Sequence, residues 1–210
     1  MAVENVLSNF SPIISVGYSV FDIDGIDNEK ISEDVLARKD LKFDDTPGNT
    51  FNEDSYLPDT TEIQKLLNVV DEKMKEINPH YQLKTRDRST WAHILEPGES
   101  TMYHSHENPG YPVENMAFAY YSKVSENAGN LVFVMDACKR RTLIEVEPAV
   151  GRLVIFPGYV PHLTKKNDSG DTRITISGNW TCPEDKFEDF FKHVGTGQSP
   201  YLHYIGVWNG

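Results

Sequence analysis

Cysteine, long apolar runs and basic residues are all scarce in this sequence of 210 residues. Its two cysteines, Cys138 and Cys182, are too few for a disulfide framework and favour a reduced, intracellular protein. No run of 18 apolar residues occurs, so we expect no membrane-spanning helix. The first residues lack a basic start followed by an apolar run, and we therefore expect no signal peptide and a cytoplasmic location.

The charge balance is strongly acidic. Asp and Glu number 32 against 20 Lys and Arg, which gives a formal net charge of −12 at pH 7. This charge repels polyanions, so neither nucleic acid nor an anionic membrane is an expected partner. The length and a hydrophobic content of 39% indicate one globular domain, 1–210, that is large enough for a substantial core.

The N-terminal part predicts elements that flank a core. Residues 10–23 are rich in β-branched and aromatic side chains and predict one or two strands. Residues 27–38 predict a helix, and 39–59 an acidic loop long enough to cover a site. An apolar stripe at a spacing of three to four residues predicts a stronger helix over 61–77.

A succession of short strands separated by Gly and Pro turns follows. We expect strands at about 82–86, 90–96, 101–106, 114–124, 130–137, 142–147, 151–156, 161–165 and 172–181. This spacing predicts a mainly β fold, namely a sandwich, barrel or jelly roll. We therefore divide the domain into flanking elements (1–82), a β core (83–182) and a C-terminal helix and tail (183–210). The tail is aromatic and should pack on the body or on a second subunit, which would allow a homodimer.

Three histidines are the candidate metal ligands. His104 and His106 are two residues apart and would share one face of a strand. His162 lies far downstream, in F-P-G-Y-V-P-H. Together they would form a facial site with an open side, suited to iron, zinc, copper or nickel.

Arg173 opens a strand with one polar face. The run R-I-T-I-S-G-N-W places Arg173, Thr175, Ser177 and Asn179 on that face and apolar side chains on the other. A guanidinium and hydroxyls beside a metal site predict a receptor for a carboxylate, which guanidinium binds through two hydrogen bonds.

These segments resemble the 2-oxoglutarate/Fe(II)-dependent oxygenases of the prolyl-hydroxylase-like superfamily, in a branch that also occurs in cyanophages and marine bacteria. Five runs between about 88 and 182 carry the resemblance: W-A-H-I-L-E-P-G-E-S-T-M-Y-H-S-H, A-F-A-Y-Y-S, G-N-L-V-F, V-G-R-L-V-I-F-P-G-Y-V-P-H and R-I-T-I-S-G-N. The resemblance implies a double-stranded β-helix, a cupin-like jelly roll. It also implies Fe(II), 2-oxoglutarate and O2, with hydroxylation of a peptide or small molecule and release of succinate and CO2. For a phage-encoded protein the location would be the host cytoplasm.

By position, His104 and His162 resemble the iron-binding histidines. Arg173 resembles the residue that binds the far carboxylate of 2-oxoglutarate, with Thr175 beside it, and Tyr121 resembles a strand tyrosine that binds the same group. His106 departs from the family, which has Asp or Glu there. We expect His106 to be the third metal ligand; if it is not, water or halide would fill the gap and halogenation would be open.

Two other functions remain at this stage. One is a cupin-type metal enzyme that does not use 2-oxoglutarate, and the other is a non-catalytic jelly-roll protein that binds a partner or serves a structural role. Four further histidines and one tryptophan are interpreted as structural or solvent-exposed: His80, His93, His193, His203 and Trp91.

Overall fold

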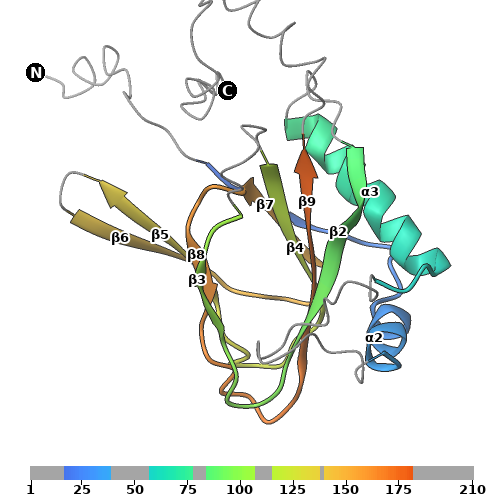
Figure 1. Ribbon diagram of the computed structural model, residues 1–210. Coiled ribbons are helices and arrows are strands. Elements are labelled where there is room, and N and C mark those ends of the chain that lie inside the picture. Colours follow the sequence, from blue (N-terminus) through green and yellow to red (C-terminus); the bar gives the residue numbers. More distant parts are fainter. Residues whose placement is uncertain (1–16, 39–56, 78–83, 107–114, 138–139, 182–210) are drawn as a thin grey trace, which may run out of the picture.

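Two antiparallel β-sheets form the body of the protein (Figure 1). A computed structural model describes residues 17–38, 57–77, 84–106, 115–137 and 140–181. The larger sheet has the order β1-β7-β4-β9-β2 and the smaller sheet the order β3-β8-β5-β6. The strands of the larger sheet are β1 (Ser19–Asp22), β2 (Lys84–Leu95), β4 (Asn115–Lys123), β7 (Arg152–Pro157) and β9 (Arg173–Thr181). Those of the smaller sheet are β3 (Thr101–His104), β5 (Leu131–Ala137), β6 (Arg140–Val146) and β8 (His162–Thr164).

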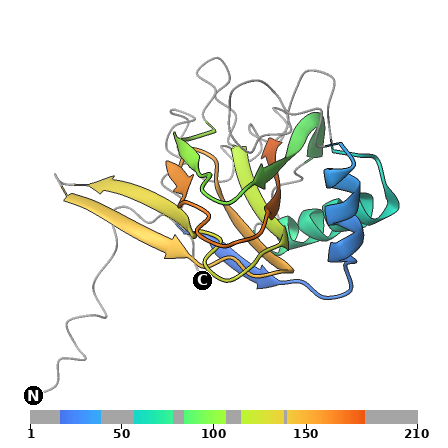
Figure 2. The same cartoon turned by 90° about the horizontal axis from the view of Figure 1, so that it is seen from below.

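Two helices cover the outer face of the larger sheet (Figures 1 and 2). In α3 (Thr61–Ile77), Ile63, Leu66, Val70 and Met74 are buried, because their spacing of three to four residues puts them on one side of the helix. The shorter α2 (Asn28–Leu36) begins at Asp27, whose side chain accepts a hydrogen bond from the Lys30 backbone N–H at 3.0 Å. Both helices lie where the sequence predicts them.

The strand β4 divides its side chains between two cores. Phe118 and Tyr120 belong to the cluster beneath the helices, whereas Ala117, Ala119 and Tyr121 face the smaller sheet. This alternation follows from the two-residue period of a strand. The inner cluster also contains Leu131, Phe133, Val154 and Phe156, and it forms the floor from which the site is built.

The predicted mainly β fold is confirmed, with differences at element boundaries. The strands expected at 82–86 and 90–96 are one strand, β2, with a register shift between Thr85 and Thr90. The strand expected over 101–106 ends at His104, so that His106 follows it without regular pairing. Within the stretch expected as strand over 10–23, β1 occupies Ser19–Asp22. Residues 10–16, most of the predicted loop (39–56) and the predicted C-terminal helix and tail lie outside the described residues.

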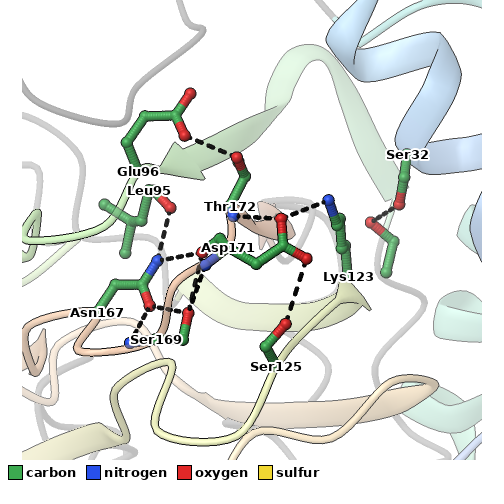
Figure 3. Close-up of polar contacts among 10 residues, drawn as sticks. Ser32, Leu95, Glu96, Lys123, Ser125, Asn167, Ser169, Asp171 and Thr172 are labelled. Carbon is green, nitrogen blue, oxygen red and sulfur yellow. Dashed lines mark hydrogen bonds and ion pairs between the residues drawn. The ribbon is translucent and has the colours of Figure 1, made fainter.

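A polar cluster around the buried Asn167 fixes the start of β9 (Figure 3). Asn167 is fully buried, and its side-chain N–H group donates to the backbone oxygens of Leu95 and Asp171, each at 2.9 Å. Thr172 donates to Glu96 at 2.6 Å, which ties the beginning of β9 to the end of β2. Asp171 forms an ion pair with Lys123, at the end of β4, at 2.9 Å. Arg173 follows this cluster directly in the sequence. The cluster therefore fixes the position of Arg173 along β9.

Neither of the two described helices is long and apolar enough to cross a bilayer.

The segment just before β5 closely approaches the segment just after β8, which allows a stability prediction at Gly129. Its φ is +86°, and an added Cβ would lie 2.2 Å from the Lys165 backbone oxygen. Gly98 has a similar φ, +91°, but open space around it. We expect backbone strain to cost about 1–3 kcal/mol in both Gly98→Ala and Gly129→Ala.

The clash should destabilise Gly129→Ala by a further 1–3 kcal/mol or more, roughly the cost of overpacking. Urea unfolding of the two variants beside the wild type measures both costs. Equal free energies of unfolding for the two variants would contradict the close approach of Gly129 to the Lys165 backbone.

Candidate metal centre and anion pocket

The three predicted histidines converge at one end of the sandwich. His104 on β3 lies directly opposite His162 on β8 in the strand pairing. His106 follows β3, and its backbone N–H donates to the Gly158 oxygen at 2.7 Å. The three potential ligand atoms all lie within 4.8 Å of one another. One metal ion could therefore contact all three imidazoles.

Hydrogen bonds set the orientation of each ring. Nδ1 of His104 lies 2.7 Å from the Met102 carbonyl oxygen, and Nδ1 of His162 lies 2.8 Å from that of Val160. Nδ1 of His106 lies 2.5 Å from Oδ1 of Asn179. An oxygen acceptor at Nδ1 requires the proton there, which leaves the lone pair of Nε2 available to a metal. The donor set therefore fits a divalent transition metal in which imidazole nitrogen is the common ligand.

Burial keeps two of the three rings uncharged. It lowers the pKa of His162 to about 3 and that of His106 to about 4, so both rings are neutral at pH 7. Among the described residues the cluster contains these three histidines and no carboxylate. Glu107 lies outside the described residues. Three neutral ligands would leave the full charge of a divalent ion to be balanced by whatever else binds it.

A second group of polar atoms lines the same pocket. Arg173 is 2% exposed, and neither its Nε nor its Nη1 has a hydrogen-bond partner among the residues that the structure describes. Its guanidinium carbon lies 5.0 Å from the centre of the Tyr121 ring, and the Tyr121 hydroxyl is also buried without a partner. Nδ1 of His93 is a third such group. Of the six buried, unpartnered side-chain atoms among the described residues, four belong to these three residues.

The electrostatics of this group favour a bound anion. Burial raises the pKa of Tyr121, against the effect of the nearby Arg173 cation, so the phenol remains a donor. Burial also lowers the pKa of Arg173, but a guanidinium stays charged in proteins. A buried cation without a partner is costly, and an anion that accepts its hydrogen bonds would remove that cost.

Strand register places the donors on one wall. Thr175 on β9 lies opposite His93 on β2 and opposite Tyr121 on β4, so these three residues form one row across three strands. Arg173 precedes Thr175 by two residues and shares its face. The row and the histidine cluster line one pocket that holds about 440 Å³ of space, part of it open to solvent. An elongated anion could reach the donors at one end and the metal at the other.

Sequence reasoning brought together six residues that the structure places around this pocket: His104, His106, His162, Arg173, Thr175 and Tyr121. It missed His93 and Trp91, which also line it. A signal was available, because Trp91 and His93 alternate with the buried apolar residues Ala92 and Ile94 of β2. Polar groups at every second position of an otherwise apolar strand indicate an inward polar face.

The chain resembles known proteins both in sequence and in fold. Residues 89–179 match the family described as "Putative 2OG-Fe(II) oxygenase". No curated protein matches the chain.

Solved structures match over most of the chain. A prolyl-4-hydroxylase from Pseudomonas putida has a TM-score of 0.59 at 16% identity, covering 81% of this chain and 94% of its own. A prolyl hydroxylase from Trichoplax adhaerens, in complex with a hypoxia inducible factor peptide fragment, has the same TM-score and identity, covering 93% and 91%. The α-ketoglutarate-dependent carbocyclase SnoK from nogalamycin biosynthesis has a TM-score of 0.58 at 14% identity, covering 83% and 85%. At these identities the structures show the fold, the predicted jelly roll.

Asn179 allows a prediction about metal affinity. We expect Asn179→Ala to weaken metal binding about 10- to 100-fold, because His106 loses the acceptor that orients its ring. Asn179→Asp keeps an acceptor and should retain most of the affinity. Titration of Co(II) or Zn(II) into the purified proteins measures the dissociation constants. Wild-type affinity in the alanine variant, with an unchanged circular dichroism spectrum, would show that this hydrogen bond does not position a ligand.

Proposed function

We propose, from the match of residues 89–179 to the family described as "Putative 2OG-Fe(II) oxygenase", that this chain is a dioxygenase that hydroxylates a peptide or small molecule. Fe(II) and 2-oxoglutarate, when bound, supply the activation of O2, with 2-oxoglutarate ending as succinate and CO2 and the substrate gaining a hydroxyl oxygen. One observation carries this proposal. A buried, unpaired Arg173 shares a pocket with three histidines whose Nε2 atoms are available.

The three histidines would hold the iron. Their Nε2 lone pairs are neutral donors, and the backbone and amide oxygens behind them keep the rings oriented before any metal binds. Preorganisation of this kind removes the cost of ordering the ligands at the moment of binding. His106 stands where the family has a carboxylate. Because its ring is anchored toward the cluster, it would occupy that ligand position, which favours hydroxylation over halogenation.

Arg173, Thr175 and Tyr121 would bind the far carboxylate of 2-oxoglutarate. A guanidinium can donate two parallel hydrogen bonds to one carboxylate, and the Nε and Nη1 atoms of Arg173 are the unpaired ones. The phenol of Tyr121 would add a third donor. These residues orient the co-substrate and leave its keto acid end directed at the histidines. The second carboxylate of this dianion would offset one of the two positive charges that three neutral histidines leave on iron.

Apolar side chains would keep water away from the reacting end. Phe156 lines the pocket and its ring centre lies 4.8 Å from that of His162, while Leu131 lines the same pocket. In such surroundings charge interactions are stronger than in water. A cupin-type enzyme would also explain the histidine site. It would not explain why the guanidinium of Arg173 is buried beside that site, and we therefore prefer the oxygenase.

The metal and co-substrate can be detected together by spectroscopy. Anaerobic addition of Fe(II) and 2-oxoglutarate to the protein should produce a visible charge-transfer band, because the keto acid chelates the iron. We expect His162→Ala to lose this band, since one of three ligands is removed. Tyr103→Phe changes an exposed side chain of β3 and is the matched control. A wild-type protein that binds iron but gives no band with 2-oxoglutarate would contradict the proposal.

Arg173 can be tested separately from the metal. Arg173→Gln keeps a polar side chain but removes the charge and the paired donors. We expect the dissociation constant of 2-oxoglutarate to rise roughly 30- to 5,000-fold, from the 2–5 kcal/mol that truncation of a buried charge pair costs. Fe(II) affinity should stay within about threefold. Calorimetry under anaerobic conditions measures both constants, and unchanged 2-oxoglutarate binding would remove Arg173 from the proposed site.

The hydroxylated substrate is the remaining unknown of this proposal. Release of succinate from 2-oxoglutarate, measured across a panel of peptides and metabolites, identifies compounds that couple to turnover. A substrate should raise succinate release above the uncoupled background and gain 16 mass units, the mass of one oxygen atom. Succinate release that no compound stimulates, with no oxidised product, would leave the proposed hydroxylation without support.

A further inference from the structure

The pair Trp91 and His93, on β2, carries an inference beyond the residues assigned so far. The indole Nε1 of Trp91 lies 2.7 Å from Nε2 of His93. An indole N–H can only donate, so Nε2 of His93 must be the acceptor and cannot carry a proton. The proton of a neutral His93 ring is therefore on Nδ1. Trp91 thus determines the tautomer of its neighbour.

Within the described part of the chain, the Nδ1–H of His93 has no acceptor. The atom is buried and without a hydrogen-bond partner, and the side chain lines the same pocket as Arg173 and the histidine cluster. Burying an N–H group without a partner costs free energy of the order of 1–3 kcal/mol. A ligand oxygen in the pocket would remove that cost.

Strand register indicates which ligand oxygen this is. His93 lies directly opposite Thr175, which lies opposite Tyr121, and Arg173 is the next residue on the same face of β9. The histidine cluster is connected to β9 further along, through Asn179. His93 therefore belongs to the Arg173 end of this polar wall. The unpartnered donors at that end are four: Nδ1 of His93, the Tyr121 hydroxyl, and Nε and Nη1 of Arg173.

A carboxylate matches this set of donors. It has two oxygens with about four acceptor positions and no donor of its own. Arg173 and Tyr121 supply three of the donors that lack a partner in the structure, and the neutral imidazole N–H of His93 adds a fourth hydrogen bond without adding charge. We infer that His93 is a further binding residue for the far carboxylate of 2-oxoglutarate, and that Trp91 is the positioning residue that keeps the His93 proton on Nδ1. This inference rests on the proposed function.

The first test observes the tautomer directly. In the full-length protein loaded with Zn(II), which is diamagnetic, 15N-labelled histidine should show Nε2 of His93 bare and Nδ1 protonated. Addition of 2-oxoglutarate should shift the Nδ1–H resonance of His93. In Trp91→Phe the preference for this tautomer should be lost. A proton on Nε2 in the wild type would overturn the inference without any variant.

The second test compares two ligands. Pyruvate has the keto acid of 2-oxoglutarate but lacks the far carboxylate. We expect His93→Phe to weaken 2-oxoglutarate binding about tenfold or more, the effect of one hydrogen bond to a charged group, and to leave pyruvate binding within about twofold. His93→Gln retains an N–H donor and should lose less. Tyr103→Phe, which is exposed and lies outside the pocket lining, should match the wild type.

The outcomes separate this inference from the proposed function. Equal weakening of 2-oxoglutarate and pyruvate by His93→Phe would place the side chain at the metal end and overturn the assignment. Unchanged binding of both ligands in folded His93→Phe and His93→Gln would overturn the donor role alone. A metal-loaded wild type that binds neither ligand would instead overturn the proposed function, and this inference with it.

Discussion

The uncompensated charge of Arg173 is the constraint on which the site depends. A guanidinium that is 2% exposed and has two unpaired N–H groups cannot be favourable by itself, so the rest of the fold must hold it in place. The buried Asn167 cluster fixes the beginning of β9 against β2 and β4, and the helices seal the opposite face of the same sheet. The packing and hydrogen bonds of this framework offset the cost of burying Arg173. A bound anion would remove that cost by accepting the hydrogen bonds of the guanidinium.

The histidine cluster and the anion pocket complement each other in charge. Three neutral imidazoles leave a divalent ion with its full charge, and the donor wall adds the positive charge of Arg173. A dianion that spans the pocket would offset two of these three positive charges, whereas a neutral ligand would offset none. A divalent ion held by these three neutral histidines would thus depend on a bound anion more than an ion in a site with a carboxylate ligand of its own.

Much of the fold could be predicted because its signals are local. The stripe of Ile63, Leu66, Val70 and Met74 defined α3, and the turn residues separated the strands. The histidines and Arg173 could be grouped because strand alternation assigns faces. The tautomer of His93 could not be predicted, since it depends on an indole two residues away and on the absence of any other acceptor, and both are three-dimensional facts. The end of β3 at His104 was missed for a similar reason, because the backbone N–H of His106 bonds to Gly158 outside any regular strand pairing.

The histidine cluster draws on both layers of the sandwich. His104 and His162 lie on adjacent strands of the smaller sheet, while Asn179 ties His106 to β9 of the larger one. An ion held by all three rings would therefore act as a clasp between the layers at that end of the molecule. Separation of the two sheets at this end would require release of the ion. Metal occupancy would therefore govern how readily the two sheets separate there.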